Sequence, residues 1–467
     1  MNNEKKKKIF VFLPDGGGLR NFVLNSFKEL GESAGLEVVY WNNSPFLIKE
    51  ELNHKELKIE EKSIHTLTPI YSRARKHIEL NISNKKLKDN VYKTYKFPLN
   101  SRGFKNCLKS LFIIILIKLY ASEKGLNKIR KKIEKFERKN PKYQYCRGQL
   151  IEHQPDLVFC SSQRNTQAIS TLLAARDLGI KTVCFIQSWD NVPKAMQVVE
   201  TDYYLVWSDL MKQELLKHYP FITKKQVYIT GTPQFEPHFN DTFLQTREVF
   251  FKENNLNIET KYICFSGDDE TTSPLDQYYL EDLANAVRSL NSKGESLGVI
   301  YRKCPFDISN RYKDVLEANE DIVKVLDPCW EQVNGKGDMM PFLEDFSMLY
   351  NVCEHSEFVT NVCSSTVFDF VIHNKPCIYY NYEQPQLKKG VRDIGQNYNY
   401  IHFRSMPSKD AVIFCCDKNK LEDLILDVLS GKVSNVKKGL KWFEIVAGAS
   451  PTKSSINIWN TLNKLLE

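Results

Sequence analysis

Short apolar strands that alternate with amphipathic helical segments are the feature that most constrains how this chain can fold. The alternation begins with KIFVFLP at 8–14, a helical segment at 18–35 and LEVVYW at 36–41. It resumes with PDLVFCSS at 155–162 and continues to QVYITG at 226–231. Near-continuous apolar strands separated by helices are typical of a parallel sheet that is covered on both faces. The pattern therefore predicts a doubly wound α/β domain.

The same pattern starts afresh after a looser stretch at 232–261, which is the expected domain junction. New strands are expected at 262–267, 297–303, 321–327 and 357–360, with helices between them. A chain of 467 residues is long enough for two large α/β halves. We expect a first domain at 1–240, a second at 241–445 and a terminal helix at 446–467 that crosses back to the first domain.

Residues 45–147 interrupt the first series and are predicted to form a basic helical insertion. Lysine and arginine crowd the section from Lys85 to Arg147, and Leu111–Ile117 (LFIIILI) is the most apolar run of the chain. That run is too short to span a bilayer, which needs about 20 apolar residues. Two interpretations stay open: a buried helix, or an element of 101–140 pressed onto an anionic membrane surface. No nucleic-acid motif accompanies the charge, so nucleic acid is not an expected partner.

Composition places the chain among folded proteins of a reducing compartment. Hydrophobic residues make up 42% and charged residues 26%, which argues against wholesale disorder. The 12 cysteines form no CxxC pairs, and Cys160, Cys184, Cys264 and Cys377 fall inside apolar strands. Such spacing favours buried, reduced thiols over disulfides or a zinc site. No signal peptide is expected at the N-terminus, so a cytoplasmic location is predicted.

Loops after the strands of the second half collect groups that bind phosphate. Gly267 directly follows one strand, Arg302 and Lys303 end the next, and Ser364–Thr366 begin a helix after a third. Arg and Lys neutralise phosphate, while hydroxyls and helix N–H groups surround its oxygens. Since the carboxyl ends of parallel strands meet at one edge of a sheet, the loops predict a diphosphate site there.

Two loops of the first half carry candidate carboxylates. Asp15 and the glycines Gly16–Gly18 directly follow the first strand, but GGGLRN lacks the GxGxxG spacing of a dinucleotide site. The segment QSWDNVPK at 187–194 offers a flat aromatic ring at Trp189 and a carboxylate at Asp190. A carboxylate within hydrogen-bond reach of a substrate hydroxyl can act as a general base.

Three passages together resemble a known superfamily. They are residues 187–219, from QSWDNVPK to LLKHY; residues 227–236, VYITGTPQFE; and residues 360–380, TNVCSSTVFDFVIHNKPCIYY. The chain resembles the GT-B superfamily of glycosyltransferases over residues 5–445, in particular bacterial enzymes of surface-carbohydrate synthesis. CDP-glycerol glycerophosphotransferases are more distant relatives of the same pattern. Cys304-Pro305 departs from the His-Pro pair that related sequences often carry after the basic strand end.

The resemblance implies two Rossmann-like domains facing a cleft, with the donor nucleotide in the second domain and the acceptor in the first. It implies no metal and no cofactor besides the nucleotide-sugar substrate. Asp15 or Asp190 would be the catalytic base. The acceptor-binding residues would be Gly16, Gly17, Gly18, Trp189 and Asn191. The donor-binding residues would be Gly267, Asp268, Arg302, Lys303, Ser364, Ser365, Thr366, Asp369 and Glu383.

The expected function is transfer of a sugar from a nucleotide-sugar donor to a hydroxyl of a lipid-linked surface glycan, such as lipopolysaccharide or capsule. The enzyme would act in the cytoplasm, peripherally at the inner face of the cell membrane. Three alternatives remain: CDP-polyol phosphotransfer, UDP-sugar epimerisation on the same fold, and a non-catalytic scaffold that binds glycan or membrane. Fold alone does not separate them.

Overall fold

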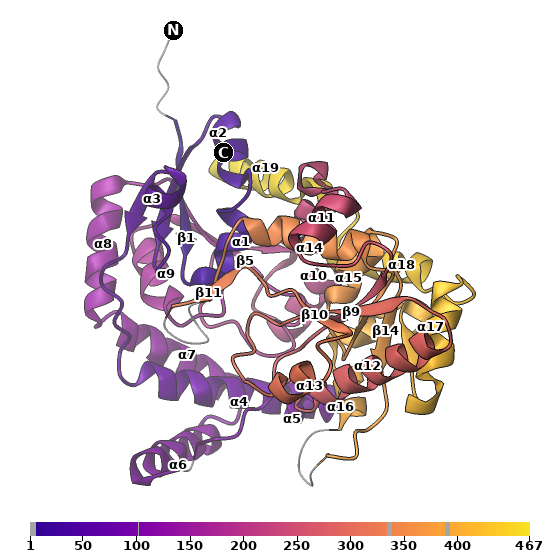
Figure 1. Cartoon of the computed structure of the whole chain (residues 1–467). Helices are drawn as coiled ribbons and strands as arrows, with labels where there is room; N and C mark the ends of the chain where they lie inside the picture. Colours follow the sequence, from indigo (N-terminus) through magenta and orange to yellow (C-terminus); the bar gives the residue numbers. More distant parts are fainter. Residues whose placement is uncertain (1–5, 101, 334–338, 388–392) are drawn as a thin grey trace. The chain divides into compact units, whose positions relative to one another are not determined.

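A computed structural model gives the fold of the chain and describes residues 6–100, 102–333, 339–387 and 393–467. The chain forms two compact units (Figure 1). The first unit comprises residues 1–232 together with 448–467, and the second comprises 233–447. The unit boundaries thus lie eight and two residues from the positions expected from the sequence, 240/241 and 445/446.

The first unit is built on a seven-stranded parallel sheet of order β3-β2-β1-β4-β5-β6-β7. Its strand order reverses between β1 and β4, where Ile9–Phe12 pair with Leu157–Cys160. Both central strands are almost wholly buried because helices cover both faces of the sheet. The strands are β1 (Lys8–Leu13), β2 (Glu37–Asn42), β3 (Glu56–Lys58), β4 (Leu157–Cys160), β5 (Lys181–Phe185), β6 (Tyr203–Val206) and β7 (Val227–Ile229).

The helix expected at 18–35 is broken in the structure. Asn25 accepts a hydrogen bond from the backbone N–H of Phe27 (3.0 Å) and donates one to the carbonyl of Asn21 (2.9 Å). Such local side-chain bonds compete with helical ones and end the first piece after one turn. The helices that flank this sheet are α1 (Leu19–Phe22), α2 (Phe27–Ser33), α9 (Ala168–Asp177), α10 (Asp209–His218) and α19 (Ser454–Leu466).

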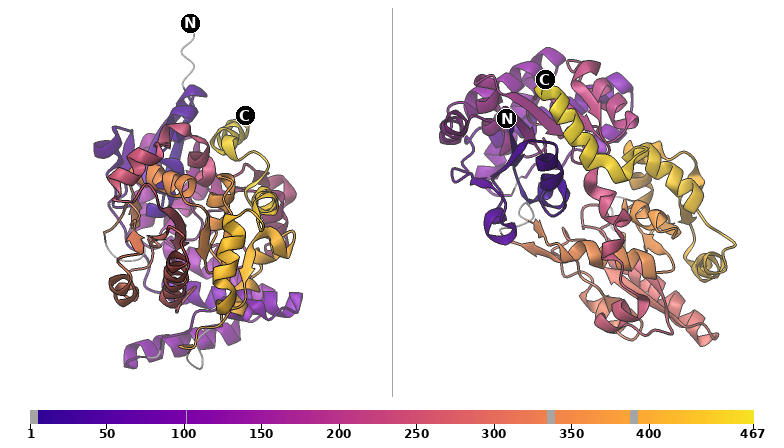
Figure 2. Two further views of the ribbon diagram at one scale, coloured as in Figure 1. Left: turned by 45° about the vertical axis from the view of Figure 1, so that its right-hand side comes forward. Right: turned by 90° about the horizontal axis from the view of Figure 1, so that it is seen from above.

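Helix α19 returns from the end of the chain to its beginning and packs on α2 (Figure 2). The Trp459 ring lies 4.6 Å from the Phe27 ring, and its Nε1 donates to the Phe27 carbonyl at 2.6 Å. A Cβ on Gly31 would come within 2.6 Å of the same indole, so glycine is required there. The C-terminal segment is therefore an integral part of the first unit.

The basic insertion between β3 and β4 is helical, as expected. The apolar run lies on α6, which packs on α4. Only Ile113 and Leu116 of α6 are buried, so the interpretation of this run as a buried helix is wrong. Among the described residues, no helix is long and apolar enough to cross a membrane. The insertion comprises α4 (Thr68–Leu87), α5 (Val91–Thr94), α6 (Phe104–Leu119), α7 (Glu123–Glu137) and α8 (Pro141–His153), with α3 (Ile48–Leu52) preceding β3.

The second unit has a six-stranded parallel sheet of order β10-β9-β8-β13-β14-β15 and a separate antiparallel pair, β11-β12. Its strands are β8 (Lys261–Ser266), β9 (Leu297–Arg302), β10 (Val323–Val325), β11 (Trp330–Gln332), β12 (Met339–Pro341), β13 (Val359–Asn361), β14 (Cys377–Tyr380) and β15 (Ile413–Cys415). Its helices are α11 (Arg247–Glu253), α12 (Asp276–Ser292), α13 (Lys313–Ala318), α14 (Glu344–His355), α15 (Thr366–Ile372), α16 (Ile394–Tyr398), α17 (Leu421–Leu429) and α18 (Val436–Ala447). This confirms the predicted fold class, two Rossmann-like α/β domains with a helical insertion in the first.

The segment Pro233–Phe239, expected as part of a linker, is a short 3-10 helix held in the second unit. The Phe235 ring lies 5.0 Å from the Phe443 ring of α18 in an edge-to-face arrangement. Aromatic packing of this kind fixes the start of the unit. The predicted burial of Cys160, Cys184, Cys264 and Cys377 is confirmed, and all four thiols are free.

Candidate active site

The loops after β8 and β13 meet at the carboxyl edge of the second sheet. The Ser266 hydroxyl lies 3.0 Å from the Thr366 hydroxyl, which lies 2.8 Å from the hydroxyl of Ser364. These strands are neighbours in the sheet, so their carboxyl ends deliver the three side chains to one place. Three hydroxyls at the carboxyl edge of a parallel sheet are suited to bind the oxygens of an anion.

The backbone of the second loop is held in an uncommon conformation. Cys363 has φ of +47°, in the left-handed region that side-chain-bearing residues rarely adopt. It directly precedes Ser364, whose carbonyl accepts a hydrogen bond from the Tyr379 hydroxyl. Ser365 stands at the N-cap of α15 without a capping hydrogen bond from its side chain. A backbone held in such a conformation is common in ligand-binding loops, and the Ser365 hydroxyl two residues later has no hydrogen bond among the described residues.

Gly267 allows this edge of the sheet to pack closely over two tyrosines. A Cβ at Gly267 would lie 2.9 Å from Cε2 of Tyr301 and 3.1 Å from the hydroxyl of Tyr312. The Tyr312 hydroxyl donates to the buried carboxylate of Asp276 at 2.5 Å, and the backbone N–H of Asp268 donates to the same oxygen at 2.9 Å. Glycine is therefore required at this position, because a side chain here would collide with the two tyrosines.

Burial raises the pKa of the Asp268 carboxyl well above its usual value, and the neighbouring Asp269 and Asp276 raise it further. Burial disfavours the charged form of this carboxyl and so lessens the repulsion that it would exert on an anion. Asp268 directly follows Gly267, so it lies in the loop where the anion site was expected.

Arg302 ends β9 beside Ser266, as the sequence pattern expected, but its side chain is already paired within the fold. Its guanidinium is buried and forms an ion pair with Asp345 at 2.5 Å, while Nη1 donates to the carbonyl of Asp327 at 3.1 Å. Asp345 also accepts hydrogen bonds from the backbone N–H of Cys329 and from the indole of Trp330. The positive charge is already neutralised within the fold, so Arg302 acts as a structural cation.

Lys303, the next residue, is half-buried and forms no ion pair with the described residues. It follows β9, the neighbour of β8, and therefore stands at the same carboxyl edge as the hydroxyl-bearing loops. Of the two cations expected at this edge, Lys303 is the one whose charge is available to a ligand.

Asp369 belongs to a chain of four titratable groups that the sequence did not reveal; Asp369, His238 and His373 are buried, and Glu354 is partly exposed. His238 Nε2 lies 2.8 Å from Asp369 Oδ1, His238 Nδ1 lies 3.0 Å from His373 Nε2, and His373 Nδ1 lies 2.9 Å from Glu354 Oε2. Burial lowers the pKa of His373. His238 carries no local signal, because its partners lie more than 100 residues away in the sequence.

Glu383 is exposed beyond β14, and its Oε1 accepts a hydrogen bond from the backbone N–H of Ile394 at 2.8 Å. The neighbouring Gln384 is buried and donates to Asp282 at 2.7 Å. Glu383 thus stabilises the loop after β14, with its second oxygen uncommitted in the hydrogen bonds of the described residues.

In the first unit, the loops after β1, β4 and β5 are joined by hydrogen bonds. Asp15 accepts from the N–H of Gly17 at 3.0 Å and from the amide of Asn165 at 2.9 Å. Gln187 donates to the Gly17 carbonyl at 3.2 Å and accepts from Ser162 at 2.7 Å. One oxygen of Asp15 therefore holds the glycine turn of Gly16–Gly18, and the other ties this turn to Asn165 in the loop after β4.

Asp190 lies in a turn with its neighbours Trp189 and Asn191. Its Oδ1 accepts from the Asn191 amide at 2.8 Å, and its Oδ2 pairs with Lys194. Trp189 and Asn191 are buried, while the Asp190 side chain is half-buried. The Asp190 carboxylate interacts electrostatically with Glu214 of α10, a residue that the sequence did not single out. Burial and this carboxylate raise the pKa of Glu214 to about 7.

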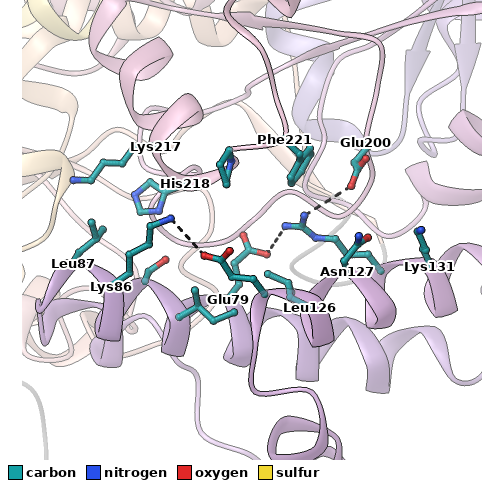
Figure 3. Close-up of a pocket in the computed structure, with 15 residues that line it drawn as sticks. Glu79, Lys86, Leu87, Leu126, Asn127, Lys131, Glu200, Lys217, His218 and Phe221 are labelled. Atoms are coloured by element: carbon teal, nitrogen blue, oxygen red, sulfur yellow. Dashed lines mark hydrogen bonds and ion pairs between the residues drawn. The ribbon is translucent and has the colours of Figure 1, made fainter.

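A cavity of about 500 Å³ lies in the helical insertion of the first unit (Figure 3). Helices α4 and α7 and the end of α10 form its walls, and Glu79 lies at its centre. Glu79 pairs with Arg130 at 3.0 Å, and the Arg130 guanidinium lies 4.8 Å from the centre of the Phe221 ring. The cavity contains none of the residues that the sequence assigned to donor or acceptor.

Comparisons with known proteins identify the fold. No protein-family model matches the chain, and no curated protein matches its sequence. Among solved structures, UDP-bound MnaA of S. aureus is 11% identical with a TM-score of 0.53, covering 98% of this chain and 97% of that chain. A putative UDP-N-acetylglucosamine 2-epimerase of Listeria monocytogenes is 11% identical with a TM-score of 0.54, covering 99% and 97%. A glycosyltransferase of Rickettsia africae is 12% identical with a TM-score of 0.50, covering 99% of both chains.

These matches extend over both units and support the predicted resemblance to the GT-B superfamily. They do not support the more distant resemblance to CDP-glycerol glycerophosphotransferases. At 11–12% identity they establish the architecture alone. The chain therefore has the GT-B fold, with two Rossmann-like α/β units and a basic helical insertion in the first.

Proposed function

We propose that this protein is a metal-independent glycosyltransferase that moves a sugar from a nucleotide-sugar donor to a hydroxyl of a lipid-linked surface glycan. The observation that carries the proposal is the cluster of Ser266, Ser364 and Thr366 hydroxyls at the carboxyl edge of the second sheet. Its position matches the place where ligands bind in doubly wound folds. Two of the compared structures are UDP-bound MnaA and a putative UDP-N-acetylglucosamine 2-epimerase, which favours a nucleotide-linked substrate.

In this proposal the second unit binds the donor diphosphate through hydroxyls and one lysine. Ser364, Ser365 and Thr366 donate hydrogen bonds to phosphate oxygens. Lys303 offsets the negative charge that develops on the departing nucleotide, so that a metal ion is not required. Electrostatic stabilisation of a leaving group is commonly a large contribution to catalysis.

We propose Asp190 as the general base that takes the proton from the acceptor hydroxyl. Asp15 is less suited, because it is buried and its oxygens bind Gly17 and Asn165, whereas the Asp190 side chain is half-buried. The Asp190–Lys194 pair lies at a partly exposed position, where exchange of the lysine for a substrate hydroxyl costs little.

Asp190→Asn tests the assignment of the base. General bases contribute roughly 10²- to 10⁴-fold to the rate, so we expect kcat to fall by at least about 100-fold with an unchanged Tm. Asp15→Asn, the matched control, should lower Tm because it disturbs the turn. Full activity of Asp190→Asn would remove Asp190 from the mechanism.

Thermal unfolding with a panel of UDP, GDP, CDP, dTDP and CMP compounds tests the donor site. A ligand at about 100 times its Kd stabilises by roughly 2.7 kcal/mol, which raises Tm measurably. Ser365→Ala should abolish the increase, since its hydroxyl makes no capping bond whose loss would disturb the fold. Ser292→Ala removes an exposed hydroxyl at the far end of α12 and should leave the increase unchanged.

Product analysis separates the proposal from its alternatives. Sugar transfer requires an acceptor, whereas an epimerase would convert a UDP-sugar by itself. Release of CMP from a CDP-polyol would establish phosphotransfer instead. If no nucleotide raises Tm and Asp190→Asn has no effect, the protein is a non-catalytic scaffold.

A further inference from the structure

Helix α6 presents an apolar face away from the helix on which it packs. Ile113 and Leu116 are buried toward α4, the helix that contacts α6 most extensively. Seven large apolar side chains of the same helix are between 38% and 82% exposed. They are Phe104, Leu108, Leu111, Phe112, Ile114, Ile115 and Leu119. Phe112 lies nearest to α4, with its ring 6.2 Å from that of Tyr71. Figure 1 shows α6 projecting from α4 at the lower edge of the first unit.

The exposed side chains form one continuous stripe with lysines beside it. At about 100° per residue, all of these except Ile114 fall within an arc of roughly 100° on the helix surface. Lys105 borders this arc on the side of Phe112, with Lys109 farther round on the same side. Lys118 borders it on the other side, where Ile114 continues the apolar surface, and all three lysines are exposed. Residues 102–120 contain no aspartate or glutamate. A large apolar stripe bordered only by positive charge is uncommon on a surface that faces water.

We propose that α6 docks onto an anionic lipid bilayer, lying in the plane of the interface. The stripe would enter the boundary between headgroups and acyl chains, as interfacial amphipathic helices do. The lysines would extend from its margins to the lipid phosphates. The 16 residues of α6 give a contact about 24 Å long. This inference does not depend on the proposed function.

A second copy of the chain fits the stripe less well than a bilayer does. Two copies related by a twofold axis would bring the same stripe into contact with itself. The lysines along both margins would then face one another without a carboxylate from α6 between them. An anionic surface instead complements both the apolar stripe and the charge around it.

Sedimentation of the full-length protein with lipid vesicles tests the inference. The protein should bind vesicles that contain phosphatidylglycerol much more tightly than vesicles of phosphatidylcholine alone. The double variant Leu111→Glu and Ile115→Glu should weaken binding by at least about tenfold, because it places charge within the stripe. Ile151→Glu changes a comparably exposed apolar residue of α8 and should bind as the unchanged protein does.

A second variant tests the electrostatic part. Replacing Lys105, Lys109 and Lys118 by Gln should weaken binding by roughly 100-fold, since each lysine near an anionic surface contributes about fivefold. Lys224→Gln with Lys225→Gln, at exposed positions outside the insertion, should have no comparable effect. Circular dichroism and Tm would show that each variant is folded.

Three results would overturn the inference. The unchanged protein could fail to bind phosphatidylglycerol vesicles, or the double variant could bind them equally well. Light scattering could instead show a dimer that the double variant dissociates, without any lipid binding; the stripe would then be an interface between copies of this chain.

Discussion

At the scale of single residues, Arg302 shows how burial changes the meaning of a charged strand end. The sequence places Arg302 and Lys303 side by side, and both look equally able to bind phosphate. The fold directs Arg302 inward to Asp345, 43 residues later in the chain. Along a strand, adjacent side chains point to opposite faces of the sheet, but the sequence does not show which residue each side chain will contact.

Arg302→Ala should destabilise the second unit, and any loss of ligand binding should be the smaller effect. Removing one partner of a buried ion pair leaves the other charge uncompensated and typically costs about 3–5 kcal/mol. Urea unfolding would measure the loss. Lys303→Ala, the matched control, should change the free energy of unfolding by no more than about 0.5 kcal/mol. Equal stabilities of the two variants would contradict the structural role of Arg302.

Glu214 should make the stability of the first unit depend on pH. Its pKa in the folded protein is raised to about 7, from an ordinary value of 4.5. The folded state then binds the proton more tightly than the unfolded state does. This stabilisation is complete below about pH 4.5 and is lost as the pH rises through about 7.

Glu214→Gln removes that dependence, because the amide keeps the shape of the neutral acid. At pH 8 the variant should be more stable than the unchanged protein by about 1–3 kcal/mol, and at pH 4 the two should be nearly equal. Unfolding by urea at both pH values would measure the difference. Glu50→Gln, at an exposed position of α3, should show no such change. A stability gain for Glu214→Gln that is the same at both pH values would contradict the pKa shift.

At the scale of elements, strands could be predicted better than helices. Each core strand is a short apolar run between turn residues, and β1 and β9 lie within the predicted ranges. The helix expected at 18–35 is interrupted because the Asn25 side chain competes for backbone hydrogen bonds. For α6, LFIIILI is apolar on every side, so its periodicity could not show which side packs. The position of α4 determines which side of α6 is buried.

Helix α19 carries a prediction of its own at this scale. Trp459→Ala should destabilise the first unit by about 3–5 kcal/mol, because the indole is buried against Phe27 and Gly31. Ile456→Ala, at a 43% exposed position of the same helix, should cost much less. Urea unfolding would compare the two variants. Equal losses of stability would show that the contact of Trp459 with Phe27 and Gly31 is not what holds α19 in the first unit.

At the scale of the whole molecule, the sequence predicted the GT-B architecture but only part of the candidate site. The loops after the strands were sufficient to predict Ser364 and Thr366 at the sheet edge, because parallel strands place their carboxyl ends together. Ser266, the third hydroxyl of the cluster, was not singled out. The contacts of Asp369 were not predictable in the same way. His238 meets Asp369 and His373 from more than 100 residues away in the sequence, and no local pattern encodes such a contact.

The division of the chain leads to a last prediction about the second unit. All pairs of its six-stranded sheet, and the Arg302–Asp345 and His238–Asp369 contacts, lie within the continuous segment 233–447. The first unit needs both ends of the chain, because α19 packs on α2. A fragment of residues 233–447 should therefore fold cooperatively by itself, with a size of about 200 residues that suits one domain.

The fragment should also retain nucleotide binding if the donor site lies wholly in the second unit. Its Tm should rise with the same nucleotide that stabilises the full chain, and Ser365→Ala should abolish the rise in both. A cooperative transition without the nucleotide effect would mean that binding requires residues of the first unit. A fragment without a cooperative transition would show that the contacts within the second unit are insufficient for its folding.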